Sequence, residues 1–316
     1  MKKVVIPKMI IDSYPPLVVI SGPTASGKTK VSILLSKVLE AEILSFDSRQ
    51  FYKEMSIGTA KPSPNELSLA PHHFIGHKSI QEEYQADLFS QDGRKLIQEL
   101  SLKKKPIILV GGSGLYLDAL LYGFDAIPDL DPKIRESLNQ EFQTKGLGHI
   151  QNLLREKDPI YFDQVDKLNP QRMIRGLEVC LGTGKPYSSF RTQKKNWLNN
   201  PIYKFCLSPP LPILYDRINF RVLEMMEMGL LKEVESLIPY KKLNPLKTVG
   251  YSELFDLLEN KIDRNSAIEL IQQHTRNFAK RQNTWFRRDP ENTWVKEENP
   301  EKSFEFILKR ISFLVS

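Results

Sequence analysis

Residues 22–29 match the pattern G-x-x-x-x-G-K-[ST] of a phosphate-binding loop. They are Gly22, Pro23, Thr24, Ala25, Ser26, Gly27, Lys28 and Thr29. The two glycines let successive backbone N–H groups face inward, and the positive end of the following helix reinforces this anion site. Lys28 would place a point charge on the terminal phosphate, and the Thr29 hydroxyl would bind a Mg²⁺ ion that bridges phosphate oxygens. The segment therefore predicts a polyphosphate-binding loop.

The loop alone does not identify the polyphosphate. A GTPase would also carry a DxxG segment, and no aspartate in this chain has glycine three positions later. Residues 260–263 spell Asn-Lys-Ile-Asp, which matches NKxD, but they follow the helical pattern of residues 252–259 instead of an apolar strand. We interpret 260–263 as a helix end, so a GTPase switch protein is disfavoured.

Asp47 directly follows the apolar segment 42–46, the next predicted strand after the phosphate loop. Since the carboxyl ends of parallel strands share one edge of a sheet, Asp47 should face the same crevice as Lys28. A carboxylate there can accept a proton from a nucleophile or organise Mg²⁺ through water, whereas the structural alternative is a cap for the next helix. Gln50 lies within one turn of Asp47, and we interpret its amide as able to read a polar edge.

A second glycine cluster, Gly-Gly-Ser-Gly at residues 111–114, also follows an apolar segment and precedes a helical pattern. The dinucleotide-binding fingerprint fails here because its third glycine would fall at Leu117. Two interpretations stay open: a tight turn from strand to helix, or a turn that presents Ser113 to a substrate.

The hydrophobic pattern provides the elements that would position these motifs. Residues 17–20, 42–46 and 106–110 read as buried strands, and helical patterns lie between them. Strands that alternate with helices predict right-handed crossovers and a parallel sheet that is covered on both faces. The predicted fold class is therefore α/β, with ligands at the carboxyl ends of the strands.

The strand pattern stops near residue 128 and returns after residue 200. We predict the first part of the core at 1–127, a helical insertion at 128–200, and the rest of the core with basic helices at 201–316. Within the insertion, Asn169 and Pro170 predict the start of a helix, and Gly182 predicts its end.

Composition sets the class of protein. The 316 residues are 41% hydrophobic and 26% charged, as in ordinary globular proteins, and a net charge of +7 favours a polyanionic partner. No apolar run approaches the ~20 residues of a membrane span, and the basic start lacks a cleavage site, so we expect neither a membrane partner nor secretion. Cys180 and Cys206 lie in apolar runs, which predicts buried free thiols in a cytoplasmic protein. We also expect a monomer.

Five ordered segments resemble the tRNA dimethylallyltransferases, also called tRNA isopentenyltransferases. They are GPTASGKT from Gly22, DSRQFYKEMSIGTAKP from Asp47, GGSGLYLDAL from Gly111, NPQRMIRGLEV from Asn169 and FAKRQNTWFRR from Phe278. The resemblance implies a P-loop nucleoside-kinase-like parallel-sheet core with a helical insertion. It also implies transfer of a dimethylallyl group from dimethylallyl diphosphate to N6 of the adenine 3′ of the anticodon, with Mg²⁺ as cofactor and the tRNA anticodon stem-loop as partner.

The same resemblance implies roles for individual positions. Residues 22–29 match the diphosphate loop, with Lys28 and Thr29 in catalytic roles and Thr29 at the metal, and Asp47 matches the general base for the adenine amine. The tRNA-contacting positions are Asp47, Ser48, Arg49, Gln50, Ser113, Arg135, Gln171, Arg172, Met173, Ile174 and Arg175. The chain departs from the usual family residues at Phe51, Ser56, Ser113 and Gly176, and none of these departures removes an assigned charge.

Charge placement agrees with an RNA partner. Residues 272–288 include no acidic residue and several basic ones, which are Arg276, Lys280, Arg281, Arg287 and Arg288. We interpret Arg276, Lys280 and Arg281 as tRNA-binding; the alternative is a solvated basic face over a core-packed stripe at Phe278 and Trp285. Arg217 and Arg221 are one helical turn apart, so they fit either a clamp on the diphosphate, in which we place Arg221, or an ordinary surface pair.

Two other functions would share some of these features. A small-molecule P-loop kinase would use the same loop, bind ATP there and need a substrate-side acid, but it would leave the basic helices without a purpose. The other alternative is a non-catalytic RNA-binding protein that keeps a vestigial nucleotide site.

Overall fold

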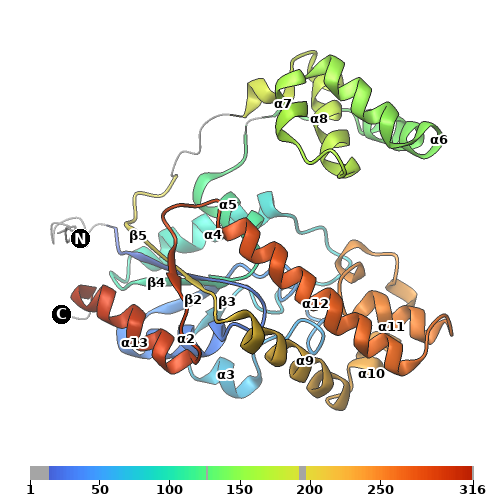
Figure 1. The fold of residues 1–316 in the computed structure, drawn as a ribbon. Coiled ribbons are helices and arrows are strands. Elements are labelled where there is room, and N and C mark those ends of the chain that lie inside the picture. Colours follow the sequence, from blue (N-terminus) through green and yellow to red (C-terminus); the bar gives the residue numbers. More distant parts are fainter. Residues whose placement is uncertain (1–13, 126, 192–196, 315–316) are drawn as a thin grey trace. The chain divides into compact units, whose positions relative to one another are not determined.

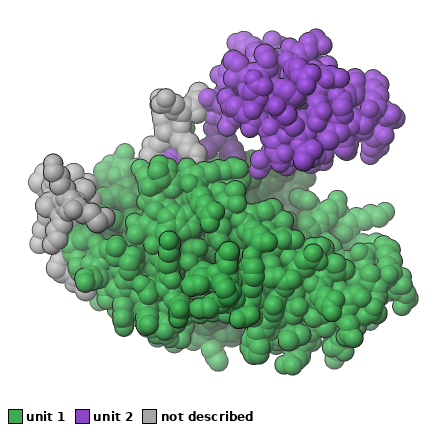
Figure 2. Space-filling model, viewed as in Figure 1, with its two compact units in different colours: residues 1–121, 196–316 green, residues 122–195 purple. Residues whose placement is uncertain are grey.

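The computed structural model describes residues 14–125, 127–191 and 197–314. The predictions for the amino-terminal basic segment therefore lie outside the described residues. The chain divides into two compact units, residues 1–121 with 196–316 and residues 122–195, which Figure 2 shows in different colours. The sequence analysis places the insertion at 128–200, a few residues later at each boundary.

The first unit contains a parallel sheet, as predicted. Its strands are β1 (Leu17–Ser21), β2 (Glu42–Ser45), β3 (His72–His73), β4 (Ile107–Gly111), β5 (Ile202–Leu207) and β6 (Thr293–Val295). Their order is β3-β2-β4-β1-β5-β6, and every pair is parallel. The sequence analysis missed β3 and β6 because runs of two and three residues are too short to show a period.

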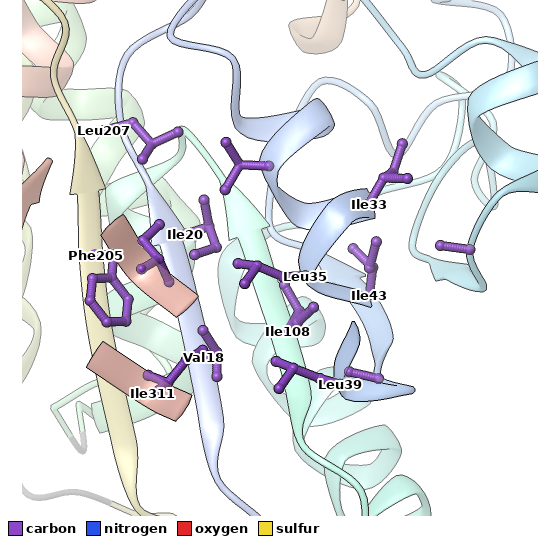
Figure 3. Packing of buried hydrophobic residues seen from close by; sticks show 14 of the residues in the cluster. Val18, Ile20, Ile33, Leu35, Leu39, Ile43, Ile108, Phe205, Leu207 and Ile311 are labelled. Atoms are coloured by element: carbon purple, nitrogen blue, oxygen red, sulfur yellow. The ribbon is translucent and has the colours of Figure 1, made fainter. Parts of the chain in front are cut away.

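One face of the sheet is covered by α2 (Lys28–Leu39) and α13 (Pro300–Ile311). Alternate residues of β1, Val18 and Ile20, point to this face and are fully buried in a cluster with Leu35 of α2 and Ile311 of α13 (Figure 3). Helices from the amino-terminal and carboxyl-terminal parts of the described residues, α2 and α13, thus pack on one layer. Truncation of such a residue to alanine costs about 2–5 kcal/mol in other proteins, so this layer holds β1 and the loop after it in place.

Helices also cover the opposite face (Figure 1). They include α4 (Ala86–Ser101) and α5 (Gly114–Tyr122), which touch where a Cβ on Gly93 would lie 2.7 Å from Leu120. The other helices of this unit are α3 (Pro64–Ser68), α9 (Leu211–Glu227), α10 (Leu230–Ser236), α11 (Tyr251–Leu258) and α12 (Arg264–Phe286), with 3₁₀ turns at Ile238–Tyr240, Asn244–Leu246 and Ser312–Leu314.

The second unit is helical in its described residues. It consists of α6 (Pro132–Lys157), α7 (Pro159–Gln164), α8 (Pro170–Thr183) and a 3₁₀ turn at Tyr187–Phe190. Asn169 caps α8 as predicted, because its side chain accepts the Arg172 N–H at 3.2 Å. The predicted end at Gly182 is wrong: α8 continues to Thr183, and Gly184 at φ 69° forms the cap.

None of the helices in the described ranges has the length and hydropathy needed to cross a bilayer. Cys180 and Cys206 are both buried free thiols, as predicted. Asp263, the last residue of the NKxD match, accepts the N–H groups of Asn265 and Ser266 and so caps the start of α12. That match is a turn between α11 and α12, in agreement with its interpretation as a helix end.

Candidate active site

The predicted phosphate loop connects β1 to α2. Gly22 and Gly27 have φ values of 143° and 90°, and a Cβ on Gly22 would lie 2.4 Å from the Leu207 carbonyl oxygen. Any larger residue at position 22 would clash with β5. The first N–H groups of α2 have no intrahelical partner, so the loop ends in donors that point away from the helix.

Two side chains in the loop are prepared for an anion. The Ser26 hydroxyl oxygen is buried and has no hydrogen-bond partner among the described residues. Lys28 donates from Nζ to the Pro23 carbonyl at 2.6 Å, so its ammonium group reaches back across the loop. Burial lowers the pKa of Lys28 to about 8, although the negative charge of Asp47 opposes this shift. A bound anion would restore the solvation that this ammonium group has lost.

Segments from several parts of the first unit surround a cavity of about 1040 Å³. It is lined by the phosphate loop, the segment after β2, the turn after β4, and parts of α9 and α12. Its apolar lining includes Ile218, Val222, Met225, Ile271 and Phe278. A polar phosphate end and an apolar wall therefore share one space, as an amphipathic organic phosphate would require.

Asp47 follows β2 and lines this cavity. The chain is fixed at this point because the Phe46 N–H donates to the Val110 carbonyl at 2.8 Å, and the Asp47 carboxylate accepts the Arg49 N–H at 3.2 Å. Burial raises the pKa of Asp47, while the Arg49 N–H and the charge of Lys28 partly offset the rise. A carboxylate with a raised pKa beside a phosphate loop suits a proton acceptor.

Arg217 and Arg221 on α9 have different roles. Arg217 donates to the backbone carbonyl of Glu298 and so ties α9 to the chain before α13. Arg221 lines the cavity without a hydrogen bond or ion pair to any residue in the described ranges. After burial and Asp47, the charge of Arg221 is the next influence on the pKa of Lys28, which places the two cations near each other. Of the two, Arg221 lines the cavity and Arg217 does not, so Arg221 keeps its predicted role at the diphosphate.

Ser113 lies in the turn between β4 and α5. Its hydroxyl accepts the Ser48 N–H at 3.0 Å and lies 3.0 Å from the Ser48 hydroxyl. The turn is tight because a Cβ on Gly111 would lie 2.6 Å from the Phe46 ring. Within this tight turn, Ser113 holds the residue next to Asp47. Ser113 also lines the cavity, so its presentation to a substrate stays a prediction.

Known proteins are similar in sequence to most of this chain. The model of the IPP transferase family matches residues 50–289. The chain is 46% identical over 297 residues to the tRNA dimethylallyltransferase of Christiangramia forsetii, covering 94% of this chain and 98% of the relative. It is 48% identical over 284 residues to that of Flavobacterium psychrophilum, covering 88% and 92%. The chain belongs to the IPP transferase family.

Solved structures of the family share this fold. The full-length tRNA isopentenylpyrophosphate transferase of Bacillus halodurans has a TM-score of 0.70 at 33% identity, with 95% of this chain and 96% of that one covered. A eukaryotic dimethylallyltransferase acting on tRNA has a TM-score of 0.75 at 25% identity, with 94% and 80% covered. The predicted family, the α/β fold class and the enzyme class, a transferase, are confirmed.

Within this family member, side chains of the segment after Asp47 donate to backbone carbonyls of the protein itself. Gln50 donates from its amide to the carbonyls of Thr59 and Ala60, at 3.2 and 3.0 Å, so its NH₂ group is already used inside the protein. Arg49 donates to the carbonyls of Asn244 and Pro245 at 3.4 and 3.1 Å. The NH₂ group of Gln50 thus shapes the loop. Gln50 also lines the cavity, so the reading of a polar edge by its amide oxygen stays a prediction.

The residues predicted to contact tRNA in the helical unit differ in exposure. Gln171 and Arg172 are exposed at the start of α8, as RNA contact requires. Arg175 and Arg135 share the carboxylate of Glu178, at 2.9 and 3.7 Å. The side chains of Met173 and Ile174 are both 0% exposed in the core of this unit, so the prediction that they face RNA is corrected. Period 3.6 turns them inward while their neighbours face out.

Helix α12 presents two different faces. Lys280 and Arg281 are exposed, whereas Arg276 donates to the Asn219 side chain and is half-buried. Phe278 and Trp285 line the cavity, and Phe278 is 38% exposed. The core-packed alternative is therefore wrong for Phe278, whereas the Trp285 ring is partly buried against Gly114. Helix α12 thus carries solvent-facing basic side chains on one side and aromatic side chains that line the candidate active site on another.

Sequence reasoning missed one anchor of the cavity wall. Glu233 on α10 accepts the N–H groups of Ser56, Ile57 and Gly58 at 2.8–3.1 Å and the Tyr251 hydroxyl at 2.6 Å. A Cβ on Gly58 would lie 2.5 Å from the Tyr251 ring. These hydrogen bonds fix the cavity-lining segment that begins at Ser56. Those from Glu233 to this segment join residues more than 170 positions apart, so no local pattern announces them.

Replacement of Ser113 by alanine removes the acceptor for the Ser48 N–H. We expect kcat to fall about 5- to 30-fold with unchanged tRNA affinity, because one buried donor beside Asp47 loses its partner at a cost of about 1–2 kcal/mol. Ser90→Ala is the control, since Ser90 is buried in α4, outside the cavity lining, and its hydroxyl donates to the Asp87 carbonyl. A parallel loss of tRNA affinity in Ser113→Ala would instead support direct RNA contact.

Proposed function

We propose that this protein transfers the dimethylallyl group of dimethylallyl diphosphate to N6 of the adenine 3′-adjacent to the anticodon in tRNA. The observation that carries the proposal is a single cavity that contains the phosphate loop, Asp47 and an apolar wall. In the reaction the allylic C–O bond breaks, a C–N6 bond forms, the diphosphate leaves, and one N6 proton moves to the Asp47 carboxylate.

The phosphate loop would stabilise the leaving group. Negative charge builds on the diphosphate as the C–O bond stretches. The loop N–H groups, Lys28 and Arg221, which belong to the cavity lining, would stabilise it. The residues also fit Mg²⁺, an ion that keeps several waters and needs few protein ligands: the Thr29 hydroxyl lines the cavity, and the described residues hold no cluster of three or more metal-ligating side chains. When bound to Thr29, Mg²⁺ would neutralise diphosphate charge.

The amine would be activated by Asp47. The lone pair of adenine N6 is delocalised into the ring, so removal of a proton during attack should raise the rate about 10² to 10⁴-fold. Water would compete for the allyl cation. The apolar wall of α9 and α12, with Val222 and Phe278 among its residues, would keep water from the allyl group while the diphosphate occupies the polar end.

The tRNA would approach along α12. An adenine stacked in the anticodon loop reaches such a cavity only after it turns outward, at a cost of a few kcal/mol that interactions with the extruded base offset. Lys280 and Arg281 are exposed on α12, and Arg281 also lines the cavity. Single-stranded loop RNA with splayed bases suits this mode of recognition.

A single assay tests the proposed function. The protein is incubated with unmodified tRNA, dimethylallyl diphosphate and Mg²⁺, and digested tRNA is analysed by mass spectrometry. We expect isopentenyladenosine at the position 3′ of the anticodon. A phosphorylated small molecule formed from ATP, with no change in the tRNA, would favour the kinase. Binding of tRNA without any product would favour a non-catalytic RNA-binding protein.

Neutralisation of two exposed basic residues near the end of α12 tests whether this part of the protein surface binds RNA. Lys280→Gln with Arg287→Gln should weaken tRNA binding and reduce the slope of log Kd against log salt by about 0.7–0.9 for each phosphate that the variant no longer neutralises. Arg264→Gln, an exposed arginine at the start of the same helix, is the control. An unchanged slope in the double variant would place this end of α12 outside the RNA footprint.

A further inference from the structure

The side chain of Gln282 connects α12 to two loops of the candidate active site. It is 6% exposed, and its amide is used at both ends. The Thr24 N–H donates to Oε1 at 2.9 Å, and Nε2 donates to the Gly112 carbonyl at 2.9 Å. Thr24 belongs to the phosphate loop, and Gly112 belongs to the turn after β4. The amide therefore bridges the two loops.

The packing around this bridge is close. A Cβ on Gly112 would lie 2.2 Å from Gln282 Nε2, and a Cβ on Gly114 would lie 2.2 Å from Trp285 Cδ1. Helix α12 thus lies directly against the backbone of the turn at two points one helical turn apart. The glycines at 112 and 114 make this close approach possible.

The Gln282 bridge is connected to both Lys28 and Asp47 through only a few residues. On one side it holds Thr24, four residues before Lys28. On the other side it holds Gly112, next to Ser113, whose hydroxyl accepts the N–H of the residue after Asp47. The Gln282 amide therefore helps to fix the position of both the leaving-group site and the proton acceptor.

We propose that Gln282 is a positioning residue that holds the phosphate loop and the Gly112 turn at a fixed separation, and so keeps the diphosphate site in its binding geometry before any ligand arrives. The amide suits this task because it offers one acceptor and one donor at opposite atoms, and the loops present one donor and one acceptor. A preformed site avoids the ordering that a loose loop would undergo on binding. The inference rests on the proposed function, since it takes the loop to hold a diphosphate.

Replacement of Gln282 by methionine tests the bridge. Methionine has nearly the same length and volume, so packing is kept while both polar atoms are removed. We expect the KM for dimethylallyl diphosphate and the Kd for inorganic pyrophosphate each to rise at least about tenfold, because two buried backbone groups lose their partners. The Kd for tRNA should change less than about threefold, since the exposed basic side chains of α12 are intact.

Gln272→Met is the matched control. Gln272 lies on the same helix, and its amide donates to the Asn219 carbonyl on α9 at 3.1 Å, without a hydrogen bond to either loop. Thermal unfolding of both variants monitors stability. If both variants lose stability equally and neither changes pyrophosphate binding, the inference is overturned while the proposed function stands. If the wild-type protein itself fails to bind pyrophosphate and to modify tRNA, both are overturned.

A glutamate at this position supplies a second, pH-dependent measurement. Gln282→Glu can still accept the Thr24 N–H, but when ionised it repels the Gly112 carbonyl and the anion in the loop. Protonation restores a donor and removes the charge. The ratio of pyrophosphate Kd between this variant and wild type should therefore fall toward one as pH decreases from about 8.5 to about 5.5. A ratio that does not change with pH would contradict the bridge.

Discussion

Asp47→Asn is expected to lower kcat for tRNA prenylation by about 10² to 10⁴-fold, while the Kd for tRNA and for dimethylallyl diphosphate change little. Asparagine keeps an oxygen that can accept the Arg49 N–H, so the local turn should persist. What disappears is the proton acceptor for adenine N6. Single-turnover kinetics measured by mass spectrometry, together with binding of unmodified tRNA, separate the two effects.

The pH dependence of kcat in the wild-type protein tests the same role of Asp47. Burial raises the pKa of Asp47, so a larger fraction of this carboxyl is protonated at a given acidic pH than for an ordinary aspartate. Only the ionised form accepts a proton, and kcat should therefore fall as pH decreases through the raised pKa. We expect this acidic limb to lie above the usual range of aspartate and to be absent from the Asp47→Asn profile.

Asp263→Asn is a suitable control for this substitution. Asp263 caps α12 at the surface, and asparagine caps helices about as well as aspartate, so both stability and turnover should be retained. The control changes the same functional group in the only NKxD match of the sequence. Equal losses of turnover and tRNA affinity in Asp47→Asn would contradict a general-base role and indicate a structural one.

The parts of the site that could be predicted are those encoded in short, contiguous segments. The phosphate loop depends on glycines at fixed spacing between a strand and a helix, and each of these features is local. Asp47 could be placed because the carboxyl ends of parallel strands meet at one edge. Within a strand or helix, the period also predicts which face a side chain takes.

The parts that could not be predicted depend on interactions between distant segments. Gln282 bonds partners 258 and 170 positions away, and Glu233 reaches the Ser56 segment from a different helix. Arg217 and Arg221 share a helical face in the sequence, yet the chain before α13 takes up one of them and leaves the other in the cavity. Periodicity selects a face of α9 but does not reveal what lies opposite each position.

Side-chain exposure also corrects some of the tRNA contacts that the family resemblance implies. Residues 171–175 match a tRNA-contacting segment as a block, but an α-helix cannot present five consecutive side chains to one partner. Gln171 and Arg172 face solvent, while Met173 and Ile174 pack in the core of the helical unit. A motif thus marks where a function lies along the chain, and helix geometry decides which of its side chains perform it.

Lys28→Met is expected to have the second large effect, a fall in kcat/KM for dimethylallyl diphosphate of about 10² to 10³-fold with unchanged tRNA affinity. Loss of one preorganised donor to developing negative charge costs about 2.7–4 kcal/mol in other enzymes. Lys28 points across the phosphate loop in the structure, and burial holds its pKa at about 8, so most of it is charged at neutral pH. Steady-state kinetics at several diphosphate concentrations provide the measurement.

Lys30→Met is the matched control, because Lys30 lies two residues away on the same helix and also lines the cavity, but its side chain is exposed and paired with Glu301. Its removal should leave kcat/KM within about twofold, since exposed ion pairs contribute little. Arg221 remains in the cavity in both variants and would retain part of the charge stabilisation. If Lys28→Met and Lys30→Met lose activity equally, the effect is general electrostatic attraction of the diphosphate, and the phosphate loop does not stabilise the leaving group through Lys28.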